Sequence, residues 1–173
     1  MAVSLYDCTV ANFLQMLTGV EGFLAKGLEH FKANGPDPAD IVQTRLWPDM
    51  LPFSFQIWSV KHHSLGAIEG VKAGVFSPPP ELPDLDYAGW QKVVADAKQG
   101  LSALSRDEVE ALAGKDVSFK FRDFNLPFTA ENFLLSFSFP NFYFHATTAY
   151  DILRSKGAPL GKRDFTGPLR MKR

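Results

Sequence analysis

The chain has 173 residues, of which 46% are hydrophobic and 21% charged, and its formal net charge is −1. That composition excludes a disordered chain, and the charge excludes any overall attraction to nucleic acid or to an anionic membrane. The length suits one domain with a substantial core, so we expect a single domain over residues 1–173. The only cysteine cannot form an internal disulfide, and no stretch reaches the roughly 18 apolar residues of a membrane span. We therefore expect a cytoplasmic protein.

The first half of the chain contains two long amphipathic segments. In residues 4–34 the apolar side chains recur at spacings of three and four, which predicts a helix with one buried stripe. Gly35 and Pro36 end it, because proline cannot continue a helix. A short helical turn is predicted at residues 37–43, and a second long helix over residues 51–73.

Residues 77–83 read SPPPELP, which predicts a stiff, extended connection. A third helix is predicted over residues 87–103, where apolar positions again share one face. Ser105 and Glu108 then match a capping box, which predicts a short helix to about residue 112.

The hydrophobic period changes from that of a helix to that of a strand between residues 117 and 128. The alternating apolar residues are Val117, Phe119, Phe121, Phe124, Leu126 and Phe128. This pattern predicts a small β-hairpin. An isolated hairpin is marginally stable in water, so its phenylalanine face is expected to pack on the helices.

The last long helix is predicted from Thr129 to Arg154, with a kink at Pro140. Beyond it the chain is expected to lie as a loop on the surface, and residues 167–173 are expected to form a flexible basic tail. Four long amphipathic segments and one hairpin predict an all-α protein, a four-helix bundle with a small β-hairpin before its last helix.

The segment around His145 contains the most promising group of polar residues. At helical spacing Asn141, His145 and Thr148 share one face of the last helix, within an otherwise apolar stretch. If that face points into the bundle, an amide, an imidazole and a hydroxyl meet in a dry environment. Two interpretations stay open: a hydrogen-bonded polar layer that sets the helix register, and a ligand site.

The second helix offers a matching polar set. Gln56 and His63 lie seven residues apart on one face, and Asp49 precedes this helix. His62 and His63 are adjacent and point in different directions, so at most one of them can join a site. A transition-metal site in a bundle uses three or four histidines and carboxylates, and this set is one or two ligands short.

The C-terminal region resembles a known family. The run PNFYFHATTAYDILR at residues 140–154, followed by GAPLGKRDF at 157–165, resembles the signature of a domain-of-unknown-function family in the DinB/YfiT-like superfamily. Residues 4–7 (SLYD), 45–53 (RLWPDMLPF) and the hairpin region agree with this. The resemblance implies a DinB-like four-helix bundle with up-down-down-up topology that is often dimeric.

The resemblance also implies a location for a site. Superfamily members commonly bind a divalent metal through three histidines, one on the second helix and two on the fourth. By position these correspond to Gln56, Asn141 and His145, so this chain keeps one histidine of the three. We therefore expect neither a metal nor another cofactor.

The functional hypothesis is a metal-free small-molecule pocket between the second and fourth helices. Its expected lining is Trp47, Asp49, Phe53, Gln56, Asn141, His145 and Thr148. His145 would act as general acid or base and Asp49 would orient it, as in an isomerase, cyclase or dehydratase. One alternative is a divalent-metal enzyme with a reduced site. The other is a non-catalytic protein that uses a phenylalanine-rich surface to form a homodimer or bind a partner.

Overall fold

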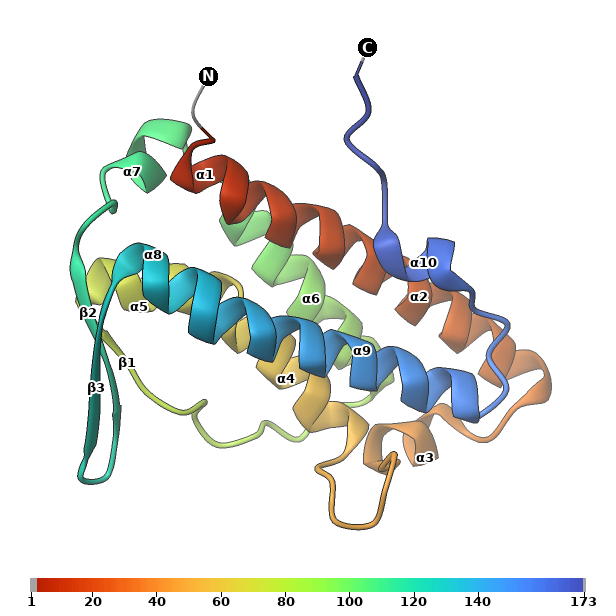
Figure 1. The fold of residues 1–173 in the computed structure, drawn as a ribbon. Coiled ribbons are helices and arrows are strands. Elements are labelled where there is room, and N and C mark those ends of the chain that lie inside the picture. The colour runs from red at the N-terminus through yellow and green to blue at the C-terminus, as the bar shows by residue number, and fades with distance from the viewer. Residues whose placement is uncertain (1–2, 173) are drawn as a thin grey trace.

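The computed structural model describes residues 3–172, and Figure 1 shows its helices packed side by side with a small sheet at one end. The first predicted helix is divided into α1 (Leu5–Cys8) and α2 (Val10–Asn34). The division lies at Thr9, whose hydroxyl donates to the Leu5 carbonyl over 2.6 Å. Ser4 caps α1 by accepting a hydrogen bond from the Asp7 amide. At the other end, α2 stops before Gly35 as predicted.

The second predicted helix is also two helices. After α3 (Pro38–Gln43) and a loop, α4 covers Phe53–His62 and α5 covers Leu65–Ala73. The chain leaves helical geometry at His63 and Ser64, where the Ser64 hydroxyl donates to the Val60 carbonyl. A continuous helix over residues 51–73 was therefore the wrong prediction, because a serine hydroxyl that bonds to the carbonyls three and four residues earlier competes with helical pairing. Gly74 ends α5 with a left-handed conformation, at φ +73°.

The sheet has three strands rather than two. Strand β1 (Val75–Phe76) runs parallel to β2 (Asp116–Phe121), and β2 pairs antiparallel with β3 (Phe124–Thr129). The hairpin is where the alternation predicted it. The all-α description is corrected to a mostly helical fold with a small three-stranded sheet, because β1 pairs with a distant part of the chain.

The third predicted helix and the short helix after it are both present in the structure. Helix α6 covers Tyr87–Ser102, and its N-terminus is capped by Asp86, which accepts from the Gly89 amide. Helix α7 covers Arg106–Glu110 and has the predicted capping box of Ser105 and Glu108. Both caps are local hydrogen-bond patterns, so the sequence alone contains them.

The last helical segment begins at the Thr129 cap with α8 (Ala130–Asn132). A π-helical segment, η1 (Phe133–Ser138), follows and leads into α9 (Phe139–Ser155). Pro140 is the second residue of α9, which continues directly from η1. The wider π turns immediately upstream thus accommodate the proline that was predicted to kink the helix.

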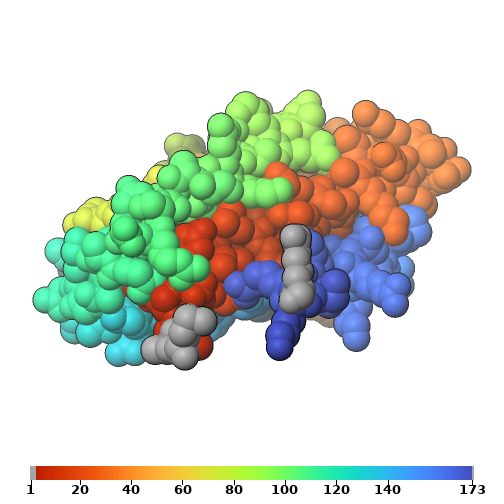
Figure 2. All heavy atoms as spheres, turned by 90° about the horizontal axis from the view of Figure 1, so that it is seen from above, coloured from red at the N-terminus to blue at the C-terminus, as the bar shows by residue number. Residues whose placement is uncertain are grey.

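The C-terminal segment contains a short helix where a loop was predicted. Lys162–Thr166 form α10, which lies against α2, as Figure 2 shows from above. Phe165 faces the rings of Phe23 and Tyr150, at centroid distances of 6.5 and 5.6 Å. Arg170 of the predicted tail donates a hydrogen bond to Asn12, and Arg173 lies outside the described residues.

Helix α4 is central to the packing because it lies against both α9 and α6, while α2 lies against α6 and α10. The buried side chains form one hydrophobic cluster to which all the long helices contribute. Within residues 3–172, no helix is long and apolar enough to cross a membrane.

Candidate functional site

The packing of α4 on α9 brings two of the predicted site residues into contact. His145 Nδ1 on α9 lies 2.7 Å from Gln56 Oε1 on α4. Gln56 is 2% exposed, and its Nε2 donates to the Leu51 carbonyl over 2.8 Å. The glutamine thus joins the start of α4 to the imidazole and holds both of its own polar atoms in hydrogen bonds.

This arrangement determines the tautomer of His145. Because the Gln56 nitrogen donates to a carbonyl, its oxygen is the atom that faces the ring, and an amide oxygen only accepts. His145 therefore carries its proton on Nδ1 and leaves Nε2 with a free lone pair. Burial lowers the pKa of His145 to about 4, so the ring is neutral at pH 7.

His63 lies beside His145 at the C-terminal end of α4. The two rings are nearly parallel, at a centroid distance of 6.0 Å and an angle of 13°. His63 is 7% exposed, and its Nδ1 has no hydrogen-bond partner. Burial, with smaller contributions from His62 and His145, lowers the pKa of His63 to about 3. A second neutral imidazole therefore extends the site along α4.

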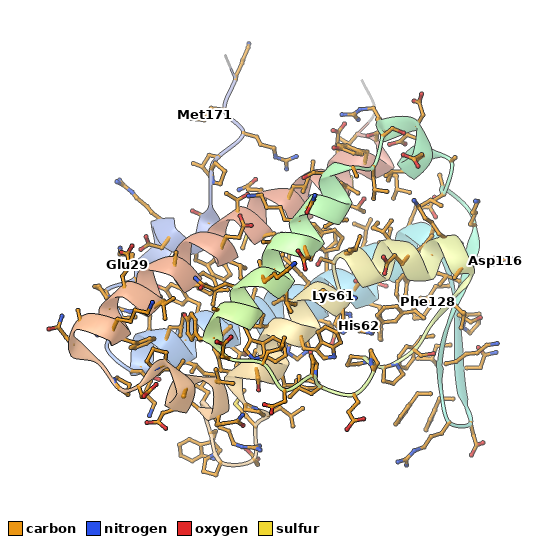
Figure 3. All side chains as sticks on the ribbon, turned by 180° about the vertical axis from the view of Figure 1, so that it is seen from behind. Glu29, Lys61, His62, Asp116, Phe128 and Met171 are labelled. Carbon is orange, nitrogen blue, oxygen red and sulfur yellow. The ribbon has the colours of Figure 1, made fainter. Side chains whose placement is uncertain are left out.

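His62 meets His63 edge-on at a centroid distance of 5.3 Å, but its hydrogen bond is to a different part of the chain. Its Nε2 donates to the Ser77 carbonyl over 2.8 Å, and its ring stacks on Phe76 at 4.3 Å. Burial is the main cause of its lowered pKa. In Figure 3, where the molecule is seen from behind, His62 lies at the end of α4.

The other predicted site residues do not converge on His145. Asn141 donates to the Phe137 carbonyl and Thr148 to the Phe144 carbonyl, each over 2.8 Å, so both bond within their own helical segment. Phe53 is fully buried and stacks on Tyr87 of α6 at 5.6 Å. Asn141 and Thr148 thus form hydrogen bonds within their own helical segment, and Phe53 is a core residue.

The last two predicted site residues, Trp47 and Asp49, lie in the loop before α4. Trp47 is 68% exposed and Asp49 is exposed, and within residues 3–172 no contact joins Asp49 to the imidazole of His145. The Asp49 carboxylate therefore does not orient His145 in this structure; Gln56 occupies that role.

Aromatic rings surround the imidazole. Phe55 and Phe144 meet His145 edge-on, at centroid distances of 5.8 and 5.3 Å. Phe144 is 57% exposed, so the ring of His145 lies at the border between core and solvent. Sequence reasoning missed Phe55, because the helical period assigned Phe53 and Ile57 to the buried face and left Phe55 outside it.

The donor set does not fit the divalent metal that the resemblance implies. His145 Nδ1 is protonated and donates to Gln56, so only Nε2 remains as a strong ligand. Among residues 3–172, no group of three His, Cys, Asp or Glu side chains is placed to hold a metal ion. The amides of Gln56 and Asn141 are poor ligands for a transition metal, and both are used in hydrogen bonds.

Comparison with known proteins supports the fold and leaves the chemistry open. A crystal structure of a DinB family member protein from Shewanella denitrificans superimposes with a TM-score of 0.79 and 24% sequence identity. The alignment covers 98% of this chain and 95% of that protein. No curated protein matches the sequence. The model of the family described as "Domain of unknown function (DUF1993)" matches residues 5–166. The chain therefore belongs to the DUF1993 family and has a DinB-like fold.

Proposed function

We propose that this protein binds a small carbonyl compound in a metal-free site between α4 and α9, with His145 Nε2 as a base. The observation that carries the proposal is the Gln56–His145 hydrogen bond, which holds the proton on Nδ1 and aims Gln56 at the ring. The low pKa of His145 makes the neutral ring a proton acceptor at pH 7 and leaves little imidazolium to act as an acid.

The chemistry of the surroundings indicates the substrate class. The edges of Phe55 and Phe144 offer an apolar setting, and His63 adds a neutral ring. A weak base of this kind suits an acidic C–H or enol, such as the carbon between two carbonyl groups of a polyketide-like compound. Isomerisation, cyclisation or dehydration begins with that proton transfer. Proton return from His145 is then rapid, because its conjugate acid is strong.

A ligand screen by thermal shift tests the proposal. We expect aromatic 1,3-dicarbonyl compounds to raise the melting temperature of the wild-type protein and to lose that effect in His145→Ala and Gln56→Leu. Thr147→Ala is the matched control, since Thr147 lies on the same helix and is exposed. Equal stabilisation of His145→Ala and wild type by every active compound would contradict the proposal.

A second candidate function, homodimer formation, is favoured by the hairpin. Its register places one apolar row on one face, with the pairs Val117–Phe128, Phe119–Leu126 and Phe121–Phe124. The base of this row packs on Phe76 and Phe137, but Phe121, Leu126 and Phe124 remain 42%, 44% and 66% exposed. An exposed apolar face of this kind is typical of a protein interface.

The dimer hypothesis has its own matched pair of variants. We expect Phe124→Ser to weaken self-association by tenfold or more, about 1.4 kcal/mol, because it removes apolar area from the interface. Asn125→Ser changes the next residue, whose pairing with Lys120 places it on the opposite face, and is expected to have no effect. Sedimentation equilibrium measures both, and a wild-type protein that is monomeric at about 100 μM would exclude the dimer.

The direction of the helices in Figure 1 supports the finer assignment of fold. Helices α2 and α9 run one way along the molecule, and α4–α5 and α6 run the other way. We infer an up-down-down-up four-helix bundle, in which the site lies between the second and fourth members, and we retain the cytoplasm as the expected location.

A further inference from the structure

A surface hollow of about 200 Å³ lies between α9 and α10. Its walls include Tyr150 and Asp151 of α9 and Lys162 and Phe165 of α10. Tyr150 and Asp151 follow His145 on the same helix, and at 3.6 residues per turn they project about 140° and about 120° away from it. The hollow is therefore separate from the His145 site.

Two aromatic rings form the apolar part of the hollow. Tyr150 and Phe165 meet edge-on at a centroid distance of 5.6 Å, and Phe165 stacks at 6.5 Å on Phe23, which is fully buried in α2. Both lining rings are only partly buried, and the accessible surface of the lining is largely apolar. Because an apolar cavity of about 150 Å³ takes one benzene molecule, the hollow has room for one apolar side chain of that size.

The same hollow carries one charge of each sign. Asp151 is partly buried and Lys162 is exposed, so a ligand from solvent reaches both. Among residues 3–172 neither belongs to an ion pair, so the carboxylate and the ammonium stay more than 4.0 Å apart although both side chains line one space. Asp164 of α10, in contrast, pairs with Lys26 of α2 at 3.3 Å. The docking of α10 thus pairs one of its charges and leaves Lys162 and Asp151 on opposite helices.

This pattern of charge indicates the chemistry of a ligand. A cation that binds at Asp151 is repelled by Lys162, and an anion that binds at Lys162 is repelled by Asp151. A zwitterion avoids both penalties, because it presents one charge to each side. An α-amino acid carries an ammonium and a carboxylate on one carbon and leaves its side chain free to enter the apolar part of the hollow.

We propose that the hollow between α9 and α10 binds a free α-amino acid with an apolar side chain. The α-ammonium donates a hydrogen bond to the Asp151 carboxylate, and the α-carboxylate accepts one from the Lys162 ammonium. The side chain lies against Tyr150 and Phe165. The proposal does not depend on the carbonyl chemistry proposed for His145, because it uses none of the residues of that site.

A titration followed by the amide signals of α10 in nuclear magnetic resonance tests this with L-phenylalanine as the probe. We expect saturable shifts with a dissociation constant on the order of 1–10 mM. Two analogues lack one charge each: phenethylamine has no carboxylate, and 3-phenylpropionate has no ammonium. Each is expected to bind about two- to fivefold more weakly, the range of an exposed ion pair. An absence of saturable shifts at about 50 mM L-phenylalanine, or equal binding of all three compounds, overturns the proposal.

Two variants assign each charge to its partner. Asp151→Asn is expected to weaken L-phenylalanine and phenethylamine about two- to fivefold and not to weaken 3-phenylpropionate. Lys162→Gln is expected to weaken L-phenylalanine and 3-phenylpropionate by a similar factor and not to weaken phenethylamine. Neither side chain is in an ion pair, so both variants are expected to keep the wild-type melting temperature.

Lys156→Gln is the matched control for the loss of a positive charge. Lys156 is exposed at the end of α9 and does not line the hollow, so all three affinities are expected to stay the same. Affinities that Asp151→Asn and Lys162→Gln leave unchanged, or that either variant weakens equally for all three compounds, contradict the assigned contacts and overturn the proposal.

Discussion

The free energy of unfolding is expected to fall by about 3–6 kcal/mol when the pH is lowered from 7 to 4. His63 and His145 have pKa values of about 3 and about 4 in the folded protein, against an ordinary value of 6.5. Between the folded pKa values and 6.5, the two imidazoles are protonated in the unfolded chain but neutral in the folded protein. The free energy of unfolding therefore rises with pH over this range and falls as the pH is lowered. The upper end of the expected range is the sum of the full contributions of His63 and His145. Water that enters the partly buried site reduces this sum.

Denaturant unfolding at pH 7, 5.5 and 4.5 measures this effect. We expect His63→Phe to reduce the pH dependence, because it removes one of the buried imidazoles with a lowered pKa and leaves His145 and His62 in place. Phe76→Leu is the control: Phe76 packs on His63 at 5.5 Å, so the variant disturbs the same cluster and keeps both histidines.

The pH range of this effect also distinguishes the two histidines from Asp7, a carboxylate with two strong hydrogen bonds. Hydrogen bonds from Arg106 and Ser4 lower the pKa of Asp7 to about 2. Stability from Asp7 is present above its ordinary pKa and is lost only as the pH falls below about 4. A stability that is flat between pH 7 and pH 4.5 would contradict the burial of His63 and His145 as neutral rings.

The second large expected effect is on stability, through the packing of α2 against α9, the helix that carries His145. Phe13→Ala is expected to lower the free energy of unfolding by about 3–5 kcal/mol. Phe13 of α2 is fully buried, stacks on Phe139 at 4.3 Å and meets Phe142 edge-on at 5.0 Å. Alanine leaves a cavity where α9 enters the core, one turn before His145.

Phe144→Ala is the matched control on α9. Phe144 is 57% exposed, so its loss is expected to cost less than about 1 kcal/mol, and its neighbour His145 stays in place. Urea unfolding monitored by circular dichroism measures both variants. Equal destabilisation by Phe13→Ala and Phe144→Ala would contradict the packing of α9 on α2.

Elements that end in local hydrogen bonds were predicted well from the sequence. The capping box of Ser105 and Glu108 and the stop at Gly35 both involve residues within a few positions of one another. The alternation of phenylalanines likewise placed the hairpin, because register and facing follow from a period of two.

Elements that depend on distant contacts were not predicted. Strand β1 forms because Val75 and Phe76 pair with Ser118 and Phe119. Two residues are too few to show a strand pattern in the sequence, so this pairing was not predicted. The break at His63–Ser64 and the π-helical segment before Pro140 are likewise choices among backbone states of similar cost. Packing against the rest of the core decides between such states.

For the site, helical spacing by itself determined which polar residues share a face: Gln56 with His63, and Asn141 with His145 and Thr148. Only the tertiary structure decided which of these meet. The packing of α4 on α9 pairs Gln56 with His145 and stacks His63 on it, while Asn141 and Thr148 bond to their own helical segment and Asp49 stays in solvent. The reason is physical: a polar side chain takes the nearest partner that the packing leaves to it, and sequence spacing specifies the face but not the neighbour across the interface.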